Sequence, residues 1–258
     1  AQRIRNVLLV AFGQKKMFRK LIPALLHLFI YVGFLVINLE VLEFIIDGLA
    51  GTHRIFAPAL GSFYNVLMNV FEFLAVAVLL SCVFFLIRRN VLKVRRFWLP
   101  EMTRWPRLDA NIILLTEIML MLAILTMNAT DQILQRTDPH YTPTGTLFFS
   151  AGLIPLLKSL PLSTLIFIER FAWWFHIVGI LAFAIYITYS KHLHIFMAFP
   201  NTFWAKTSPK AEMYQMPAVT KEVKVMLGLT DAQADSPEPP GRFGAKDIDD
   251  LPWTSLMG

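Results

Sequence analysis

The chain has 258 residues, of which 56% are hydrophobic and only 16% are charged. A soluble domain carries about 25% charged residues, so this composition excludes an ordinary soluble protein and predicts a polytopic membrane protein. Basic residues interleaved with aromatic ones, as nucleic-acid binding requires, occur only between the apolar runs. Cys82 is the only cysteine, which excludes an internal disulfide, a cysteine zinc site and an iron–sulfur cluster within these residues.

The segment before the first apolar run, residues 1–20, contains six Lys and Arg residues and no acid. The chain begins at Ala1 without a signal peptide and stops at LPWTSLMG without a terminal element. We therefore expect it to be a piece of a longer polypeptide, with residues 1–20 as a basic lead-in.

Four apolar runs are long enough to cross about 30 Å of hydrocarbon, which takes about 20 residues in a helix. They are expected at residues 21–46, 63–87, 112–127 and 162–194. The predicted fold class is therefore all-α, a bundle of four spans in this chain.

A fifth apolar stretch, GTLFFSAGLIPLL, is shorter than the four runs. It contains Pro155 and is closed by Lys158 and Pro161. This pattern favours a short helix at the membrane surface or a re-entrant one over a fifth span.

The distribution of basic residues predicts the orientation. Residues 1–20 and the connection between the second and third runs carry thirteen basic residues, whereas the other two connections carry only Arg54, Arg136 and Lys158. By the positive-inside rule, the N-terminus, the second connection and the C-terminal tail face the cytoplasm. Four spans agree with this assignment, and a fifth at Pro155 would place the Lys191 end outside.

Histidines lie at both ends of the stretch WWFHIVGILAFAIYITYSKHLHI. On a continuous helix, His176 and His194 are five turns apart, so they share one face with about 27 Å between them, whereas His192 lies about 160° away. His27, near the start of the first run, reaches a depth similar to that of His194. Imidazoles from facing helices hold haem iron from two sides, which favours a haem b bound by His27 and His194. The alternative is interfacial histidines bonded to backbone or headgroups.

His53 follows two glycines in DGLAGTHR, a connection that glycine allows to turn sharply. Three interpretations stay open: a ligand of a second haem together with His176, a donor to a quinone carbonyl, and a plain loop residue. His140, beside Pro139, is expected to be a solvated loop residue.

Acids inside apolar spans are costly and therefore candidates for function. Glu40, Glu43 and Asp47 share one face in the outer half of the first run, and Glu72 of the second run reaches a similar level. They predict either a polar seam between helices or a proton path beside a quinone. His53 and Arg54 lie next to this group. A further acid, Glu117 in the third run, has no partner that the sequence identifies.

Two stretches carry a resemblance to a known family: FGQKKMFRKLIPALLHLFIYVGFLVINLEVLEFIIDGLAGTHR and GRFGAKDIDDLPWTSL. Together with the last span, they resemble the membrane domain of iron–sulfur-binding proteins related to heterodisulfide reductase. That domain is similar to the gamma subunit of respiratory nitrate reductase. The resemblance covers essentially the whole chain.

The resemblance implies a membrane cytochrome b with two haems that exchanges electrons with quinone in the cytoplasmic membrane. It implies His27 and His194 as one ligand pair and His176 as a ligand of the second haem. The fourth ligand of the family pattern falls at Ile37, so the second haem depends on a replacement such as His53. One further helix before Ala1 and a cytoplasmic iron–sulfur domain after Gly258 are also implied.

The tail from Pro200 onward is rich in Pro, Asp, Glu and Lys and cannot bury enough apolar surface to fold alone. We expect three parts: the lead-in 1–20, a haem-binding bundle 21–196, and a strap or linker 197–258 toward the missing iron–sulfur domain. The leading function is the membrane anchor of a quinone-linked oxidoreductase in a respiratory chain. The alternative is a proton-coupled transporter or channel, which inverted repeats and broken helices would favour.

Overall fold

The computed structural model describes residues 1–15, 17–102, 104–207 and 217–229. Within these residues the chain forms helices and no strands, which confirms the predicted fold class. It divides into two units, residues 1–205 and 206–258. The described part of the second unit contains α9 (Pro217–Met226). The end of the predicted linker, residues 230–258, lies outside the described residues.

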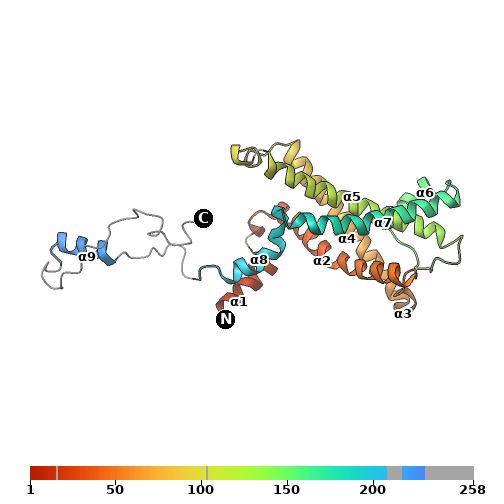
Figure 1. Cartoon of the computed structure of the whole chain (residues 1–258), viewed down its shortest axis with the longest axis horizontal. Helices are drawn as coiled ribbons and strands as arrows, with labels where there is room; N and C mark the ends of the chain where they lie inside the picture. Colours follow the sequence, from red (N-terminus) through yellow and green to blue (C-terminus); the bar gives the residue numbers. More distant parts are fainter. Residues whose placement is uncertain (16, 103, 208–216, 230–258) are drawn as a thin grey trace. The chain divides into compact units, whose positions relative to one another are not determined.

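Four helices of the first unit are long and apolar enough to cross a membrane. They are α2 (Leu21–Ala50), α4 (Ser62–Asn90), α5 (Trp105–Leu134) and α7 (Leu162–Ile187), and Figure 1 shows them running alongside one another. Large apolar side chains on their outward faces stay exposed, among them Leu39 and Ile185. Outward apolar faces are expected where lipid replaces water as the solvent.

Each long helix packs on the one before it in the sequence: α4 on α2, α5 on α4, and α7 on α5. The main core contains buried apolar residues from all four helices, including Phe44, Leu74, Leu120 and Ala172. In the described part of the chain, α2 and α7 have no comparable seam. The two helices come close together at Gly48, where an added Cβ would lie 2.9 Å from the ring of Trp173.

The third helix is longer than predicted. The sequence predicted residues 112–127, whereas α5 runs from Trp105, with Pro106 in its first turn, to Leu134. Proline favours the first helical turn because its missing N–H has no partner there. At the other end, Asn128 and Asp131 are buried and make side-chain contacts with other elements. Polar residues with such partners belong to the helix although their hydropathy suggests a loop.

The predicted continuous helix over 162–194 is wrong, because α7 ends at Ile187. A turn and a 3₁₀ segment, Lys191–Leu193, follow before α8 (His194–Phe203) begins. The side chain of Asp109 on α5 holds the turn: it accepts hydrogen bonds from the hydroxyls of Tyr186 and Ser190, both at 2.6 Å. The spacing argument that placed His176 and His194 on one helical face therefore fails.

The shorter elements lie in the connections between the long helices. Gly51 ends α2 in the left-handed conformation, with φ of +67°, and α3 (Ala57–Leu60) follows. The apolar stretch after α5 forms a 3₁₀ turn, Ser150–Leu153, and α6 (Ile154–Leu157). These short helices agree with the prediction that this stretch is not a span.

Candidate functional site

Arg54 is the centre of a buried polar cluster between α2, α4 and α5. Its guanidinium donates to Asn128 Oδ1 at 2.7 Å and lies 3.2 Å from carboxylate oxygens of both Glu40 and Asp131. Burial by itself lowers the pKa of Arg54, but Tyr64, Asp131 and Glu40 outweigh it and raise that pKa well above its ordinary value. Arg54 therefore stays positively charged, and its guanidinium is occupied by contacts within the protein.

The other predicted acids bond α4 and the connections at this end of the bundle. Asp47 accepts the backbone N–H groups of Arg54 at 2.8 Å and Ile55 at 3.1 Å. Glu43 accepts the hydroxyl of Tyr64 at 2.6 Å. Glu72, on α4, accepts the backbone N–H groups of Phe149 at 3.0 Å and Ser150 at 3.2 Å. These contacts correspond to the polar seam that the sequence left open as one of two interpretations.

Both ring nitrogens of His53 are in contact with protein groups. The backbone N–H of Thr142 donates to Nδ1 at 3.0 Å, and Nε2 lies 3.1 Å from Asp131 Oδ1. The ring also meets Tyr141 edge to face, with 4.8 Å between centroids. Both ring nitrogens of His53 thus face protein groups in this structure.

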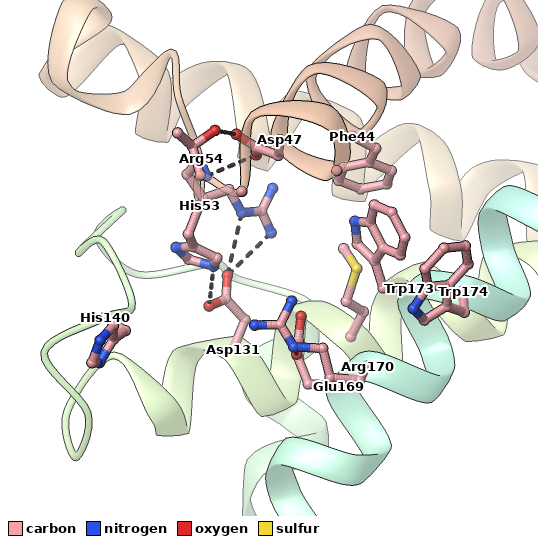
Figure 2. Close-up of a pocket in the computed structure, with 14 residues that line it drawn as sticks. Phe44, Asp47, His53, Arg54, Asp131, His140, Glu169, Arg170, Trp173 and Trp174 are labelled. Carbon is pink, nitrogen blue, oxygen red and sulfur yellow. Dashed lines mark hydrogen bonds and ion pairs between the residues drawn. The ribbon is translucent and has the colours of Figure 1, made fainter.

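A cavity of about 330 Å³ lies beside this cluster; we call it the outer cavity. Figure 2 shows Phe44, Trp173 and Trp174 on one side and Arg54, His53 and Asp131 on the other. Aromatic walls with a few polar groups are typical of sites for small organic molecules. His140, which also lines it, is 92% exposed at its side chain and pairs with Asp138, in agreement with its predicted place in a solvated loop.

Glu169 on α7 is the acid of the outer cavity with an uncommitted oxygen. Its Oε2 accepts the hydroxyl of Tyr141 at 3.2 Å and lies 3.3 Å from Arg170 Nε. For Oε1 no hydrogen bond is present among the described residues. Burial, and then the charge of Glu169, raise the pKa of Tyr141 to about 12, so this phenol stays protonated beside the carboxylate.

His176 is 1% exposed and has a defined hydrogen-bonding state. Its Nδ1 lies 3.0 Å from the backbone carbonyl of Leu120 on α5, and a carbonyl only accepts, so Nδ1 carries the proton. The lone pair is then on Nε2, which is buried and has no partner among the described residues. A ligating histidine commonly donates its other ring N–H to a carbonyl in this way.

A second cavity, of about 200 Å³, lies against His176 between α2 and α7; we call it the inner cavity. Its walls are mostly apolar and include Ile37, which faces the same space as His176. Glu117 also lines it, without a hydrogen-bond partner among the described residues. The inner cavity therefore offers one imidazole and one carboxyl group in apolar surroundings.

Three histidines gather at the end of the bundle where α2 begins and α7 ends. The rings of His192 and His194 are 5.5 Å apart. Burial, and then the nearby charges of His194 and His27, lower the pKa of His192 to about 4. His27 Nδ1 and His192 Nε2 are buried without partners, whereas His194 Nδ1 bonds the carbonyl of Lys191 at 3.1 Å. His27 and His194 are thus neighbours, and so is His192, which the sequence disfavoured.

Three acids of these sites were not singled out in the sequence. Asp131 fell in a predicted loop because the apolar run of α5 ends before it. Glu169 and Asp109 lie near the ends of spans, where charged residues are common. In the structure Glu169 is only 4% exposed and Asp109 only 2% exposed, which distinguishes them from ordinary charged residues at helix ends. This burial depends on partners that are distant in sequence.

No protein-family model matches the chain, and no solved structure matches it significantly. A relative from Bacillus subtilis named probable iron-sulfur-binding oxidoreductase FadF is 24% identical over 257 residues, covering 99% of this chain and 32% of its own length. EtfAB:quinone oxidoreductase from Syntrophomonas wolfei is 24% identical over 273 residues, covering 100% of this chain and 33% of its own length. The chain thus spans about a third of the length of the curated relatives it matches. The first name agrees with the predicted relationship to iron–sulfur-binding oxidoreductases, and the second is the name of a quinone oxidoreductase.

Proposed function

We propose that this chain is the membrane electron-transfer module of an oxidoreductase, which connects membrane quinone with iron–sulfur clusters carried elsewhere. The observation that carries the proposal is His176, because its protonation state is fixed by Leu120 and its free Nε2 is directed at no protein group. A buried lone pair without a partner costs free energy unless a ligand accepts it. The names of the two relatives, which mention iron–sulfur binding and quinone, support the same class of function.

We propose that the described histidines hold the haem b that the family resemblance implies, because His27 Nδ1 and His176 Nε2 are buried without partners among the described residues. His27 and His194 would hold one haem at the end of the bundle where α2 begins, and His176 would hold a second in the inner cavity. No group of three or more His, Cys, Asp or Glu side chains able to coordinate a metal ion occurs in the described part of the chain, but haem needs at most two protein ligands. Haem, when bound, accepts and donates single electrons.

The outer cavity is the proposed place for the quinone headgroup. Trp173, Trp174 and Phe44 supply flat apolar walls, and Glu169 supplies an uncommitted carboxylate oxygen. Glu169 and His176 are seven residues apart on α7, which places them on one face about 10 Å apart along the axis. Quinone chemistry moves protons together with electrons, so a carboxylate close to the cofactor site is the group expected to exchange protons.

The acids Glu40, Glu43, Asp47 and Glu72 take a different role from the predicted proton path. Each of them bonds Arg54, Tyr64 or the connecting segments, and Arg54 itself is fully engaged. We propose that they fix the wall of the outer cavity and that quinone contacts Glu169 and the tryptophans. The basic ends, in this proposal, face the cytoplasm of a bacterial inner membrane, and residues 197–258 lead toward the iron–sulfur domain.

An absorption spectrum of the purified chain, oxidised and then reduced with dithionite, tests the proposal. We expect the Soret and α bands of a low-spin haem b, and we expect His176→Ala to lower the haem content. The matched control is His140→Ala, which removes an exposed histidine. A spectrum without haem in preparations supplied with haem would contradict the proposal and favour the transporter alternative.

A further inference from the structure

Two helical segments at the ends of the first unit pack on each other beside the bundle. The first consists of α1 (Gln2–Asn6) and the π-helical turn Val7–Phe12, and the second is α8. The rings of Phe12 and Phe199 meet edge to face with 5.0 Å between centroids. Arg3 donates to the carbonyl of Phe203 at 3.2 Å. We call residues 1–20 and 191–205 together the basic platform.

The basic platform exposes large apolar side chains at helical spacing. Ile4, Leu8 and Phe12 are four residues apart, so they share a face, and each is more than half exposed. On the other segment, Phe196 and Met197 are exposed, and Trp204, which follows α8, is 70% exposed. Such a face needs an apolar environment that the first unit does not supply.

The residues of the basic platform carry charge of one sign, and of its bases Lys191 lies 4.0 Å from the carboxylate of Asp109 on α5. The sequence contains no Asp or Glu in residues 1–39 or 170–211, whereas residues 1–20 alone carry six basic residues. Arg5, Lys15, Arg19 and Lys20 are exposed, and no ion pair or hydrogen bond of their side chains is present in the described part of the chain. The four exposed bases of residues 1–20 are therefore complementary to an anionic partner.

The position of the basic platform is set by the helices that it adjoins. Lys20 directly precedes α2, and Lys191 follows the end of α7 by a few residues. Lys191 Nζ donates to the carbonyl of Pro106 at 2.6 Å, and Arg89 reaches the same carbonyl at 3.3 Å. The connection between α4 and α5, with its own basic residues, therefore lies at the same end. A segment that adjoins the ends of membrane-spanning helices lies at the level of the lipid headgroups.

We propose that the basic platform is a binding surface for anionic phospholipid headgroups. The bases contact the headgroup phosphates, and the apolar face enters the boundary between headgroups and acyl chains, as in interfacial amphipathic helices. An acidic protein surface would match the charges but not the row of Ile4, Leu8 and Phe12. The apolar row is therefore what selects lipid over protein as the partner.

Thermal unfolding of the purified chain in neutral detergent tests this proposal, with short-chain phosphatidylglycerol or phosphatidylcholine added in a titration. We expect phosphatidylglycerol to raise the melting temperature at lower concentrations than phosphatidylcholine. In Lys15→Gln/Lys20→Gln, the apparent Kd for phosphatidylglycerol should rise about fivefold for each lysine removed. The matched control, Arg136→Gln/Lys158→Gln, removes the same charge from exposed residues of the connection between α5 and α7 and should bind as the unmodified chain does.

A second variant, Ile4→Ser/Leu8→Ser, keeps all the bases and removes part of the apolar face. We expect it to weaken the stabilisation by both lipids. Unchanged lipid binding in this variant would overturn the proposal and leave a purely electrostatic surface suited to an acidic protein. Equal weakening by the two charge variants, or the same stabilisation by inorganic phosphate, would also overturn it.

Discussion

The carboxylate of Asp109 accepts the hydroxyl of Ser190 at 2.6 Å, and this contact joins the start of α5 to the turn that ends α7. The same carboxylate accepts the hydroxyl of Tyr186 and the backbone N–H of Lys191. One buried acid thereby fixes the direction in which the chain enters α8, where His194 is the first residue.

Replacement of Asp109 by Ala should destabilise the bundle and disturb the histidines beyond the turn. Two hydroxyls and a backbone N–H lose their acceptor, and each buried unsatisfied group costs about 1–3 kcal/mol. We expect a lower melting temperature and a lower haem content in the same variant. Asp138→Ala, in an exposed connection, is the control that should change neither. An unchanged melting temperature in Asp109→Ala would show that the turn forms without this acid.

Replacement of His27, His192 and His194, one at a time, tests which of these histidines holds a cofactor. We expect His27→Ala and His194→Ala each to remove one haem, because His194 is oriented by the carbonyl of Lys191. His192→Ala should keep that haem. The measurement is the pyridine haemochrome content per chain. Loss of haem in His192→Ala with retention in His194→Ala would assign the ligand to His192, whose Nε2 is also buried and free.

The substitution Ile37→His supplies an imidazole to the inner cavity opposite a single histidine. Ile37 and His176 line the same space, and the described walls contain no second histidine. We expect Ile37→His to raise the haem content or to shift the second haem to a bis-histidine, low-spin spectrum in electron paramagnetic resonance. Ile180→His, on the helix of His176 itself, is the matched control. Equal spectra for the two variants would contradict a ligand role for His176.

Glu169→Gln should slow the reduction of haem by a quinol analogue by about a hundredfold, the usual size of a lost general base. Haem content should stay unchanged, because the amide keeps the volume of the side chain and its bond with Tyr141. Trp173→Ala should instead raise the quinol concentration that gives half the maximal rate. Stopped-flow absorption separates the two effects. Normal rates in Glu169→Gln would remove this residue from the proton path.

Cysteine labelling tests the predicted orientation against a low background, because Cys82 is 0% exposed. An impermeant maleimide added to whole cells should label Lys158→Cys, in the connection between α5 and α7. It should spare Leu92→Cys, which is exposed in the turn after α4. The opposite pattern would place the basic ends outside and reverse the proposed direction toward the iron–sulfur domain.

Hydropathy was sufficient to locate the four long helices, because a span needs a run of apolar residues and little else. It failed at Ile187, where the helix ends inside an apolar pattern because Asp109, 81 residues away from Ser190, accepts the hydrogen bonds of the turn. The same limit applies to the buried polar cluster around Arg54. The sequence showed that Glu40 is costly in a membrane and that Arg54 is near it, but the pairing of Arg54 with both Glu40 and Asp131 depends on how three helices meet.

The seams of the bundle join helices that follow one another along the chain, and this has a consequence for biogenesis. During synthesis, α4 can dock on α2, α5 on α4, and α7 on α5, each as it enters the membrane, because the main seams between the long helices, in the part of the chain that the structure describes, join consecutive ones. The contact between α2 and α7 forms last, because α7 is the last long helix to be made. The inner cavity lies between these two helices. The haem of the proposed function would therefore enter sideways from the bilayer after translation has finished, and its insertion would add contacts between the first long helix and the last.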